Sequence, residues 1–173
     1  MNGVILYKSK YGATRQYADW LADATGFRLV EAGAVKSEDF ASCDAVIFGG
    51  GIYASGIAGL PILKKNMDLL AGKKVLAFCV GASPFDKTAF QGIVQQNMKD
   101  ELSSIPLFYC RGAWAPDKMS FKDRALCKML RKMVAKKEPA ACEPWMAALL
   151  QAGDSQCDWT DKRYLEPILS ALQ

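Results

Sequence analysis

The sequence contains no histidine among its 173 residues. Histidine is the side chain that most often transfers protons near neutral pH, and it is also a frequent metal ligand. Its absence argues against hydrolases and metalloenzymes. If this chain catalyses a reaction, we expect a bound organic cofactor to carry the chemistry.

Membrane and export signals are missing as well. No apolar stretch reaches the roughly 20 residues that a membrane span requires. The N-terminus has no basic region followed by a cleavable apolar segment. We therefore expect a cytoplasmic protein.

The six cysteines show no C-x-x-C spacing, and two of them, Cys79 and Cys110, lie within apolar runs typical of strands. This pattern favours reduced, mostly buried thiols over disulfides or a metal site. Hydrophobic residues make up 51% of the chain and nothing marks a boundary between two cores. We expect a single domain over residues 1–173.

A small, hydroxyl-bearing segment, Ser9–Thr14, separates the apolar run Val4–Tyr7 from a helical pattern. This order predicts a strand, a phosphate loop and a helix start. Free backbone N–H groups and the helix dipole favour an anion there, the hydroxyls of Ser9 and Thr14 can donate to it, and Gly12 lets the main chain come close. The alternative is an ordinary strand-to-helix turn.

The same segment lacks two familiar nucleotide signatures. It has no Gly-Lys-Ser/Thr, which argues against a nucleotide-triphosphatase loop, and no G-x-G-x-x-G spacing. A single phosphate is the simplest ligand for such a loop.

Two further loops carry small residues. The apolar run Asp44–Phe48 leads into Gly49–Gly56, which we interpret as a glycine-dense loop with one aromatic residue, Tyr53. The run Lys74–Val80 leads into Gly81–Phe85, again small and flexible in composition. For the first of these the alternative is a flexible connection without a binding role.

The alternation of strand and helix patterns predicts an α/β fold. Five strands joined by helices imply right-handed crossovers and a doubly wound parallel sheet in the order 2-1-3-4-5. In that order the loop at Ser9 and the loop at Gly49 flank a crevice. The predicted strands are Val4–Tyr7, Phe27–Val30, Asp44–Phe48, Lys74–Val80 and Pro106–Cys110.

These residues resemble the flavodoxin family, whose first loop follows the pattern Thr/Ser-x-Thr-Gly-x-Thr, here Ser9–Thr14. Tyr11 departs from it, because the pattern has a small hydroxyl residue there. Asp44–Tyr53 is similar to the second flavin loop of the family, and Gly81–Phe85 matches the third by position. The resemblance implies a flavodoxin-like fold and FMN as the cofactor.

The resemblance also implies which residues contact FMN. Tyr53 is expected to stack on the flavin ring, with Phe85 as the second choice, and no side chain is expected to act as an acid or base. The expected cofactor-binding residues are Ser9, Lys10, Tyr11, Gly12, Ala13, Thr14, Gly50, Gly51, Ile52, Tyr53, Ala54, Gly81, Ala82, Ser83 and Phe85.

Within the flavodoxin family, the C-terminal third resembles the bacterial quinone-linked protoporphyrinogen oxidases. The segments that carry this likeness are Cys110–Ala113, which leads into a basic helix, and Asp158–Asp161. The resemblance implies an oxidoreductase with a porphyrin donor and a quinone acceptor. The alternative is a non-catalytic electron carrier, although such carriers are usually acidic around the flavin, whereas this chain has a net charge of +4.

Positive charge is concentrated in Asp117–Lys137, which has a local balance of +6. We interpret residues 115–158 as an insertion, with a basic helix and a loop, before the last helix. The apolar side of this helix can lie on an anionic membrane at the inner face of the cell membrane, or dock an acidic partner. The favoured alternative is that it packs on the chain's own sheet. Nucleic acid is not expected as a partner, because no DNA-reading motif accompanies the charge.

A function of another class, the phospho-receiver domain, shares the doubly wound layout. It requires acidic residues after the first strand and an aspartate at the end of the third. Here these places hold Tyr7–Ser9 and Phe48–Gly50, so the charge that binds magnesium is missing. A cofactor-free interaction module stays open if Tyr11 blocks the pocket.

Overall fold

The apolar runs form one parallel sheet in the computed structural model, which describes residues 1–173. The strand order is β2-β1-β3-β5-β6, and the short β4 pairs antiparallel with the end of β3. The predicted doubly wound sheet with order 2-1-3-4-5 is confirmed, because only β4 offsets the numbering. The strands of this sheet are β1 (Gly3–Lys8), β2 (Arg28–Glu31), β3 (Ala45–Tyr53), β4 (Gly56–Ile57), β5 (Lys74–Gly81) and β6 (Leu107–Arg111).

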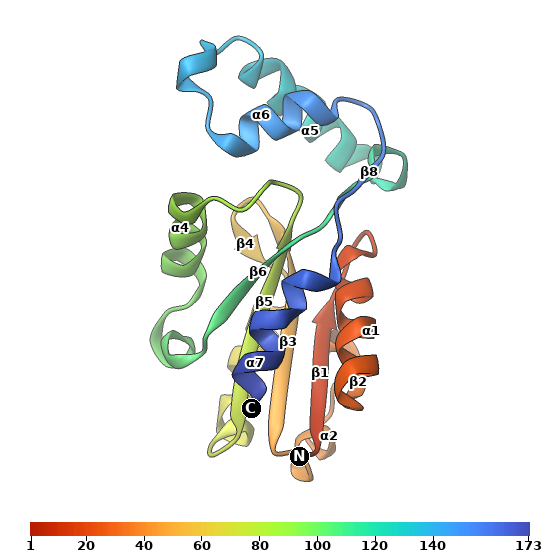
Figure 1. The fold of residues 1–173 in the computed structure, drawn as a ribbon, viewed down its shortest axis with the longest axis vertical. Coiled ribbons are helices and arrows are strands. Elements are labelled where there is room, and N and C mark those ends of the chain that lie inside the picture. The colour runs from red at the N-terminus through yellow and green to blue at the C-terminus, as the bar shows by residue number, and fades with distance from the viewer.

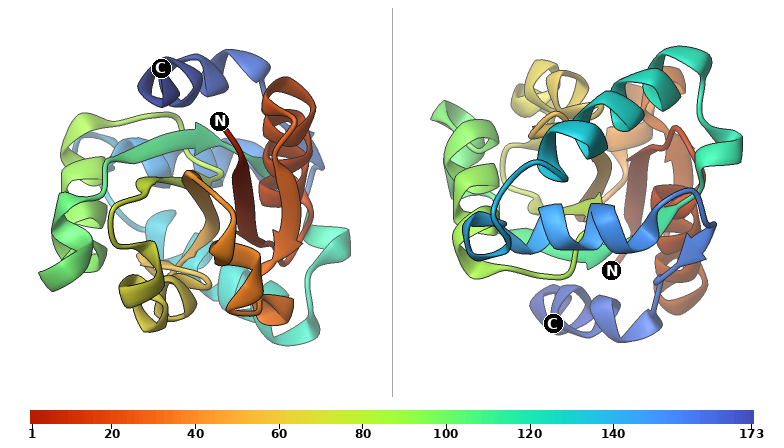
Figure 2. Two further views of the ribbon diagram at one scale, coloured as in Figure 1. Left: turned by 90° about the horizontal axis from the view of Figure 1, so that it is seen from below. Right: turned by 90° about the horizontal axis from the view of Figure 1, so that it is seen from above.

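Helices connect the strands and cover both faces of the sheet (Figures 1 and 2). Single turns of 3-10 helix extend several of them. The helices are α1 (Ala13–Thr25), α2 (Glu38–Ala41), α3 (Leu60–Lys65), α4 (Lys87–Asn97), α5 (Phe121–Val134), α6 (Pro144–Ala152) and α7 (Glu166–Leu172).

Side chains of the central strands point alternately into two separate hydrophobic cores, one on each face of the sheet. On β1, Val4 and Leu6 pack on the side covered by α3 and α4, whereas Ile5 and Tyr7 pack on the side covered by α1 and α7. A strand buried on both faces has this pattern because successive side chains point in opposite directions. Both faces of the sheet are therefore buried in the middle of the strands.

The glycine-dense segment differs from its prediction as a loop. Gly49, Gly50 and Gly51 continue β3, which turns only at Ala54 and Ser55. A Cβ at Gly49 would lie 2.2 Å from the ring of Phe78, and one at Gly50 would lie 2.4 Å from the carbonyl oxygen of Ala58. Glycine is needed here for close packing within a strand.

The C-terminal part of the chain adds α5 and α6, which lie together over the carboxyl edge of the sheet (Figures 1 and 2). Two short antiparallel strands, β7 (Ala113–Trp114) and β8 (Cys157–Asp158), join this helical pair to the sheet. We call residues 115–158 the insert. It has a small core of its own, in which Val134 of α5 meets Met146 and Leu149 of α6.

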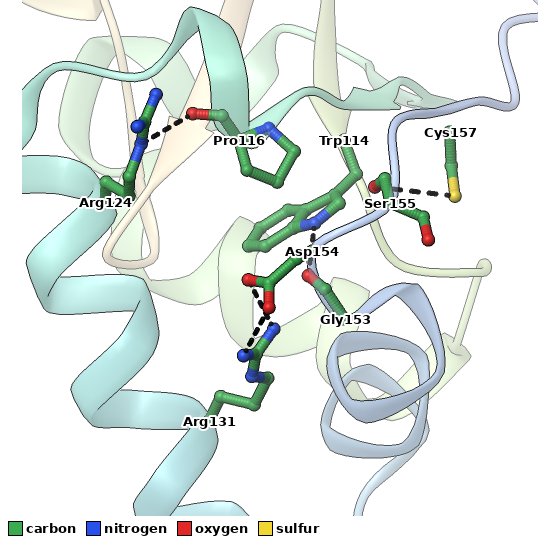
Figure 3. Close-up of polar contacts among 8 residues, drawn as sticks. All are labelled: Trp114, Pro116, Arg124, Arg131, Gly153, Asp154, Ser155 and Cys157. Carbon is green, nitrogen blue, oxygen red and sulfur yellow. Dashed lines mark hydrogen bonds and ion pairs between the residues drawn. The ribbon is translucent and has the colours of Figure 1, made fainter.

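Polar contacts fasten the insert together (Figure 3). The indole Nε1 of Trp114 donates to the carbonyl oxygen of Gly153 at 3.1 Å. Arg131 of α5 donates two hydrogen bonds to Asp154 at 2.9 and 3.0 Å. A bidentate pair restricts both side chains, so the contact holds the end of α6 beside α5.

Other predicted elements also changed in detail. The closing helix breaks into a 3-10 turn, Lys162–Leu165, followed by α7, with Pro167 in the first turn of α7, where its missing N–H costs nothing. Gly26 ends α1 in a left-handed conformation. All six cysteines are free, and Cys43, Cys79 and Cys110 are buried. None of the helices has the length and apolar character needed to cross a membrane.

The apolar side of α5 is less buried than the favoured interpretation required. Phe121 is 88% exposed and Met133 is 59% exposed, with Leu126 and Met129 also exposed. The favoured interpretation, that this side packs on the chain's own sheet, is wrong, because α5 lies over the edge of the sheet and not on its face.

Candidate functional site

A cavity of about 420 Å³, which we call the carboxyl-edge cavity, opens where the parallel strands end. Its walls are the loop after β1, the end of β3, the exits of β5 and β6, and α5 of the insert. It is lined by Ser9, Tyr11, Ala13, Thr14, Gly51, Ile52, Tyr53, Ala54, Val80, Gly81, Ala82, Gly112, Ala113, Trp114, Met119, Asp123, Leu126, Cys127, Met129 and Leu130.

The loop after β1 is shaped as an anion cradle. Gly12 has φ +103°, a conformation that side chains rarely adopt, and its N–H donates to Ser9 Oγ at 3.1 Å. The N–H of Gln16 bonds to the carbonyl oxygen of Gly12, which starts α1. The first N–H groups of a helix lack intrahelical partners, so this end of α1 offers donors and a positive dipole end.

Thr14 is the one buried polar residue of the chain, at 3% exposure, and it lines the cavity. Hydroxyl groups in buried positions are normally hydrogen-bonded. The placement of Thr14 in the first turn of α1 brings its hydroxyl beside the free helix N–H groups. Together these groups suit a phosphate.

Two glycines that line the cavity, at the exits of β5 and β6, are closely packed against the protein's own side chains. A Cβ at Gly81 would lie 2.9 Å from the hydroxyl of Tyr109, and one at Gly112 would lie 2.7 Å from Val80 Cγ1. Tyr109 also donates to the carbonyl oxygens of Gly81, at 3.1 Å, and Ser83, at 2.5 Å. Side-chain packing therefore fixes a backbone surface that a flat ligand can touch.

The mouth of the cavity is built from charged and aromatic side chains. Asp123 of α5 accepts hydrogen bonds from the Lys10 ammonium and the Tyr11 hydroxyl. The rings of Tyr11 and Tyr53 meet edge to face with centroids 6.3 Å apart. The Lys10 ammonium lies 5.7 Å from the centre of the Tyr53 ring. The insert is thus tied directly to the predicted phosphate loop.

These contacts change the acidity of the groups involved. The hydrogen bond from Lys10, and then that from Tyr11, hold the pKa of Asp123 below its ordinary value. The same bond to Asp123 raises the pKa of Lys10. Burial raises the pKa of Tyr53 and of Cys127. At neutral pH Lys10 and Asp123 therefore form an ion pair, whereas Tyr53 and Cys127 stay protonated.

The structure brings ten of the fifteen expected cofactor-binding residues to the cavity wall. These are Ser9, Tyr11, Ala13, Thr14, Gly51, Ile52, Tyr53, Ala54, Gly81 and Ala82. Lys10 and Gly12 belong to the same loop but do not line the cavity.

The other three lie elsewhere. Gly50 packs against β4 and the backbone of Ala58. Phe85 is exposed and packs on Phe90 and Tyr109, with centroids 5.6 and 5.8 Å apart, away from the cavity wall. Ser83 lies at the two neighbouring cavities.

Ten lining residues were not expected at this site, and most of them come from the insert. A sequence signal could have identified three of them, Leu126, Met129 and Leu130, because they fall on the apolar side of the basic helix. No sequence signal pointed to Asp123, because a single carboxylate among many lysines does not indicate which residue it will contact. No cluster of three or more side chains that could ligate a metal ion occurs in the chain.

Comparisons with known proteins agree with this architecture. Structures of similar fold include a WrbA-like flavodoxin from Agrobacterium tumefaciens, with TM-score 0.50 and 20% identity over 71% of this chain and 87% of that one. An archaeal flavodoxin gives TM-score 0.43 and 19% identity, with coverage of 75% and 92%. A flavodoxin from Megasphaera elsdenii gives TM-score 0.44 and 19% identity, with coverage of 62% and 82%.

No curated protein matches the sequence. A family model does: residues 4–140 match the flavodoxin domain. That region contains the whole parallel sheet, the phosphate loop and α5. Since the match spans most of the chain, the protein belongs to the flavodoxin domain family.

Proposed function

We propose that the protein binds FMN in the carboxyl-edge cavity and works as an oxidoreductase. The observation that carries this proposal is the cavity itself. It joins the anion cradle at Ser9 and Thr14 to the glycine backbone at Gly81 and Gly112. Membership of the flavodoxin family supports FMN as the ligand.

The residues present fit FMN. Backbone N–H groups at the start of α1, with the hydroxyls of Ser9 and Thr14, would hold the phosphate. Tyr53 would offer an aromatic face, and the backbone at Gly81 and Ala82 would meet the ring. The volume of about 420 Å³ lies in the range of roughly 300–1,000 Å³ typical of small-molecule sites.

Bound FMN would supply transfer of one or two electrons. The chain itself provides binding, and Leu126, Met129 and Leu130 of α5 line the cavity with apolar atoms that would shield the cofactor. Cys127 remains a thiol, because burial raises its pKa. None of the lining residues is a histidine or lysine, and the one lining carboxylate, Asp123, is paired with Lys10 and Tyr11, so we assign no side chain the role of acid or base.

A finer assignment, oxidation of a reduced porphyrin with a quinone as acceptor, follows the resemblance to the quinone-linked protoporphyrinogen oxidases. The two segments that carry this resemblance lie together in space. The Arg111 guanidinium lies 4.3 Å from the centre of the Trp159 ring. The backbone N–H of Trp159 donates to the carbonyl oxygen of Gly112 at 3.2 Å. The first segment borders the carboxyl-edge cavity through Gly112 and Ala113, and the second lies next to it, with Trp159 at a neighbouring cavity.

The alternative is an electron carrier without a substrate of its own. Carriers present the flavin edge to a partner protein, whereas here α5 of the insert, in the segment with local charge +6, covers the cavity. This cover favours small-molecule substrates over a protein partner.

Two measurements test the proposal. Titration of the purified protein with FMN should change the flavin absorption spectrum and quench tryptophan fluorescence at one equivalent. FMN-loaded protein should then oxidise a reduced porphyrin in the presence of a quinone. Absence of FMN binding would contradict the proposal. FMN binding without turnover would contradict the porphyrin oxidase assignment and favour the electron carrier.

We also propose that α5 makes peripheral contact with anionic membranes. Phe121 and Met133 are exposed on the helix, at 88% and 59%, beside Lys122 and Lys132. Exposed apolar side chains next to lysines suit the boundary between headgroups and acyl chains. Such contact would bring the cavity close to a lipid-soluble quinone.

A further inference from the structure

A second cavity, of about 520 Å³, lies beside the first. Its walls come from α4, the exit of β5 and the start of α6, and we call it the α4 cavity. The two cavities share five lining residues: Ile52, Ala54, Gly81, Ala82 and Leu130. A molecule in the α4 cavity would therefore lie next to a cofactor held in the carboxyl-edge cavity.

Aromatic side chains from three different elements line this cavity. Phe90 belongs to α4, Tyr109 to β6 and Trp145 to α6. The rings of Phe90 and Tyr109 pack edge to face with centroids 6.2 Å apart, and Phe85 packs against both. Aromatic walls of this kind favour a flat ring system as the ligand.

The charge of the lining is one-sided. Asp86 and Glu143 line the cavity, and no lysine or arginine does. Asp86 accepts from the N–H of Ala89 and Glu143 from the indole Nε1 of Trp145, each at 2.8 Å. An anion entering the cavity would meet two carboxylates and no compensating cation, which is unfavourable in a partly desolvated site.

Uncharged polar groups complete the lining. Ser55, Ser83 and Gln96 also line this space. Each can donate a hydrogen bond to a neutral carbonyl oxygen. Glu143 and Trp145 lie beyond residues 4–140, which match the flavodoxin domain, so part of this wall is built by a segment outside that match.

We propose that the α4 cavity binds a planar aromatic molecule without negative charge. The assignment rests on the proposed function, in which the molecule would be the quinone acceptor. A porphyrin donor carries carboxylates, so this cavity excludes it and the donor must approach along the basic side of α5. The two substrates would then use different routes to the cofactor.

A matched pair of ligands tests the charge rule. Anthraquinone carboxamide and anthraquinone carboxylate, substituted at the same ring position, differ in charge but little in shape. Equilibrium dialysis with FMN-loaded protein should show the carboxamide bound at least roughly tenfold more tightly than the carboxylate. Equal affinities, or no binding of the carboxamide, would overturn the proposal.

Two variants locate the site. A side chain at Gly92 of α4 enters open space, with nothing within 4 Å of its Cβ, so Gly92→Leu fills the cavity and should abolish carboxamide binding. Gly33→Leu, at another open position that lines neither cavity, is the control. Asp86→Asn with Glu143→Gln keeps both hydrogen-bond acceptors and should raise carboxylate affinity toward that of the carboxamide.

FMN titration of the same preparations separates the two proposals. Gly92→Leu should bind FMN as the unmodified protein does. If the unmodified protein binds FMN but not the carboxamide, the α4 cavity assignment fails and the proposed function stands. If FMN does not bind, the proposed function fails. Carboxamide binding by the FMN-free protein can then be compared with binding by its Gly92→Leu variant, and this comparison still decides whether the α4 cavity binds the neutral ring.

Discussion

The carboxylate of Asp123, in the first turn of α5, accepts a hydrogen bond from the hydroxyl of Tyr11 in the phosphate loop. The two residues are 112 positions apart in the chain. Tyr11 stands where the family pattern has a small hydroxyl residue, and its hydroxyl is used to hold the insert. Asp123 also pairs with Lys10, which places a carboxylate beside the expected phosphate site.

The first prediction concerns the charge of Asp123. Asp123→Asn keeps an acceptor for Tyr11, removes a negative charge near the phosphate and frees Lys10 to pair with it. We expect FMN to bind roughly three- to tenfold more tightly at low salt, with the gain shrinking in molar salt. Riboflavin, which lacks the phosphate, should bind equally to both proteins. A similar gain for riboflavin would refute the electrostatic explanation.

The same contact has a pH dependence. Because Lys10 and Tyr11 lower the folded pKa of Asp123 below its ordinary 3.8, the contact is fully present above that ordinary value. It is lost as the pH falls through the lowered folded pKa, when the carboxylate is protonated.

The second prediction concerns Thr14. Thr14→Val preserves shape but removes the hydroxyl from the phosphate cradle. A hydrogen bond to a charged group contributes about 1.5–3 kcal/mol, so FMN affinity should fall roughly 10- to 100-fold. Thr14→Ser should retain most of the affinity, and riboflavin binding should not depend on either change. Unchanged FMN affinity in Thr14→Val would place the phosphate elsewhere.

The third prediction concerns the glycines of β3. A methyl group at Gly49 meets the fully buried ring of Phe78, so Gly49→Ala should destabilise the fold by about 1–3 kcal/mol. Urea unfolding measures the loss. Gly33→Ala, in open space, should change stability little, and Phe78→Leu should partly rescue Gly49→Ala. A loss in Gly33→Ala as large as in Gly49→Ala would contradict the packing argument.

The fourth prediction uses a thiol as a reporter of the cavity. Cys127 lines the carboxyl-edge cavity, whereas Cys142 does not. FMN should slow alkylation of Cys127 by iodoacetamide severalfold and leave Cys142 unaffected, as mass spectrometry of the labelled peptides can show. Cys79 should not react in the folded protein, because burial raises its pKa to about 12. Equal protection of both accessible thiols would indicate a general closing of the structure instead of local cover.

The fifth prediction concerns the exposed side of α5. The protein should sediment with vesicles that contain phosphatidylglycerol and not with vesicles of phosphatidylcholine alone. Phe121→Ser with Met133→Ser should reduce this binding, and so should Lys122→Glu with Lys132→Glu. Lys65→Glu, an exposed change on α3, is the control. Sedimentation that is unaffected by the α5 changes would exclude membrane contact through this helix.

Local patterns in the sequence identified most of the sheet. Val4–Tyr7 and Lys74–Val80 are apolar runs, and burial on both faces of a parallel strand requires such runs. The glycines after Phe48 misled the prediction, because their composition is that of a loop. They continue a strand since Phe78 and Ala58 occupy the space where side chains would lie, and that packing is visible only once β5 and β4 are in place.

The sequence by itself determined the strands of the flavodoxin-like sheet, the loop at Ser9–Thr14 and the start of α1, because each depends on residues close together in the chain. Only the tertiary structure decided that α5 covers the loop through Asp123 and that α6 closes a second cavity with Trp145. These contacts join segments far apart in the chain, and no local periodicity records which surface such a helix will meet.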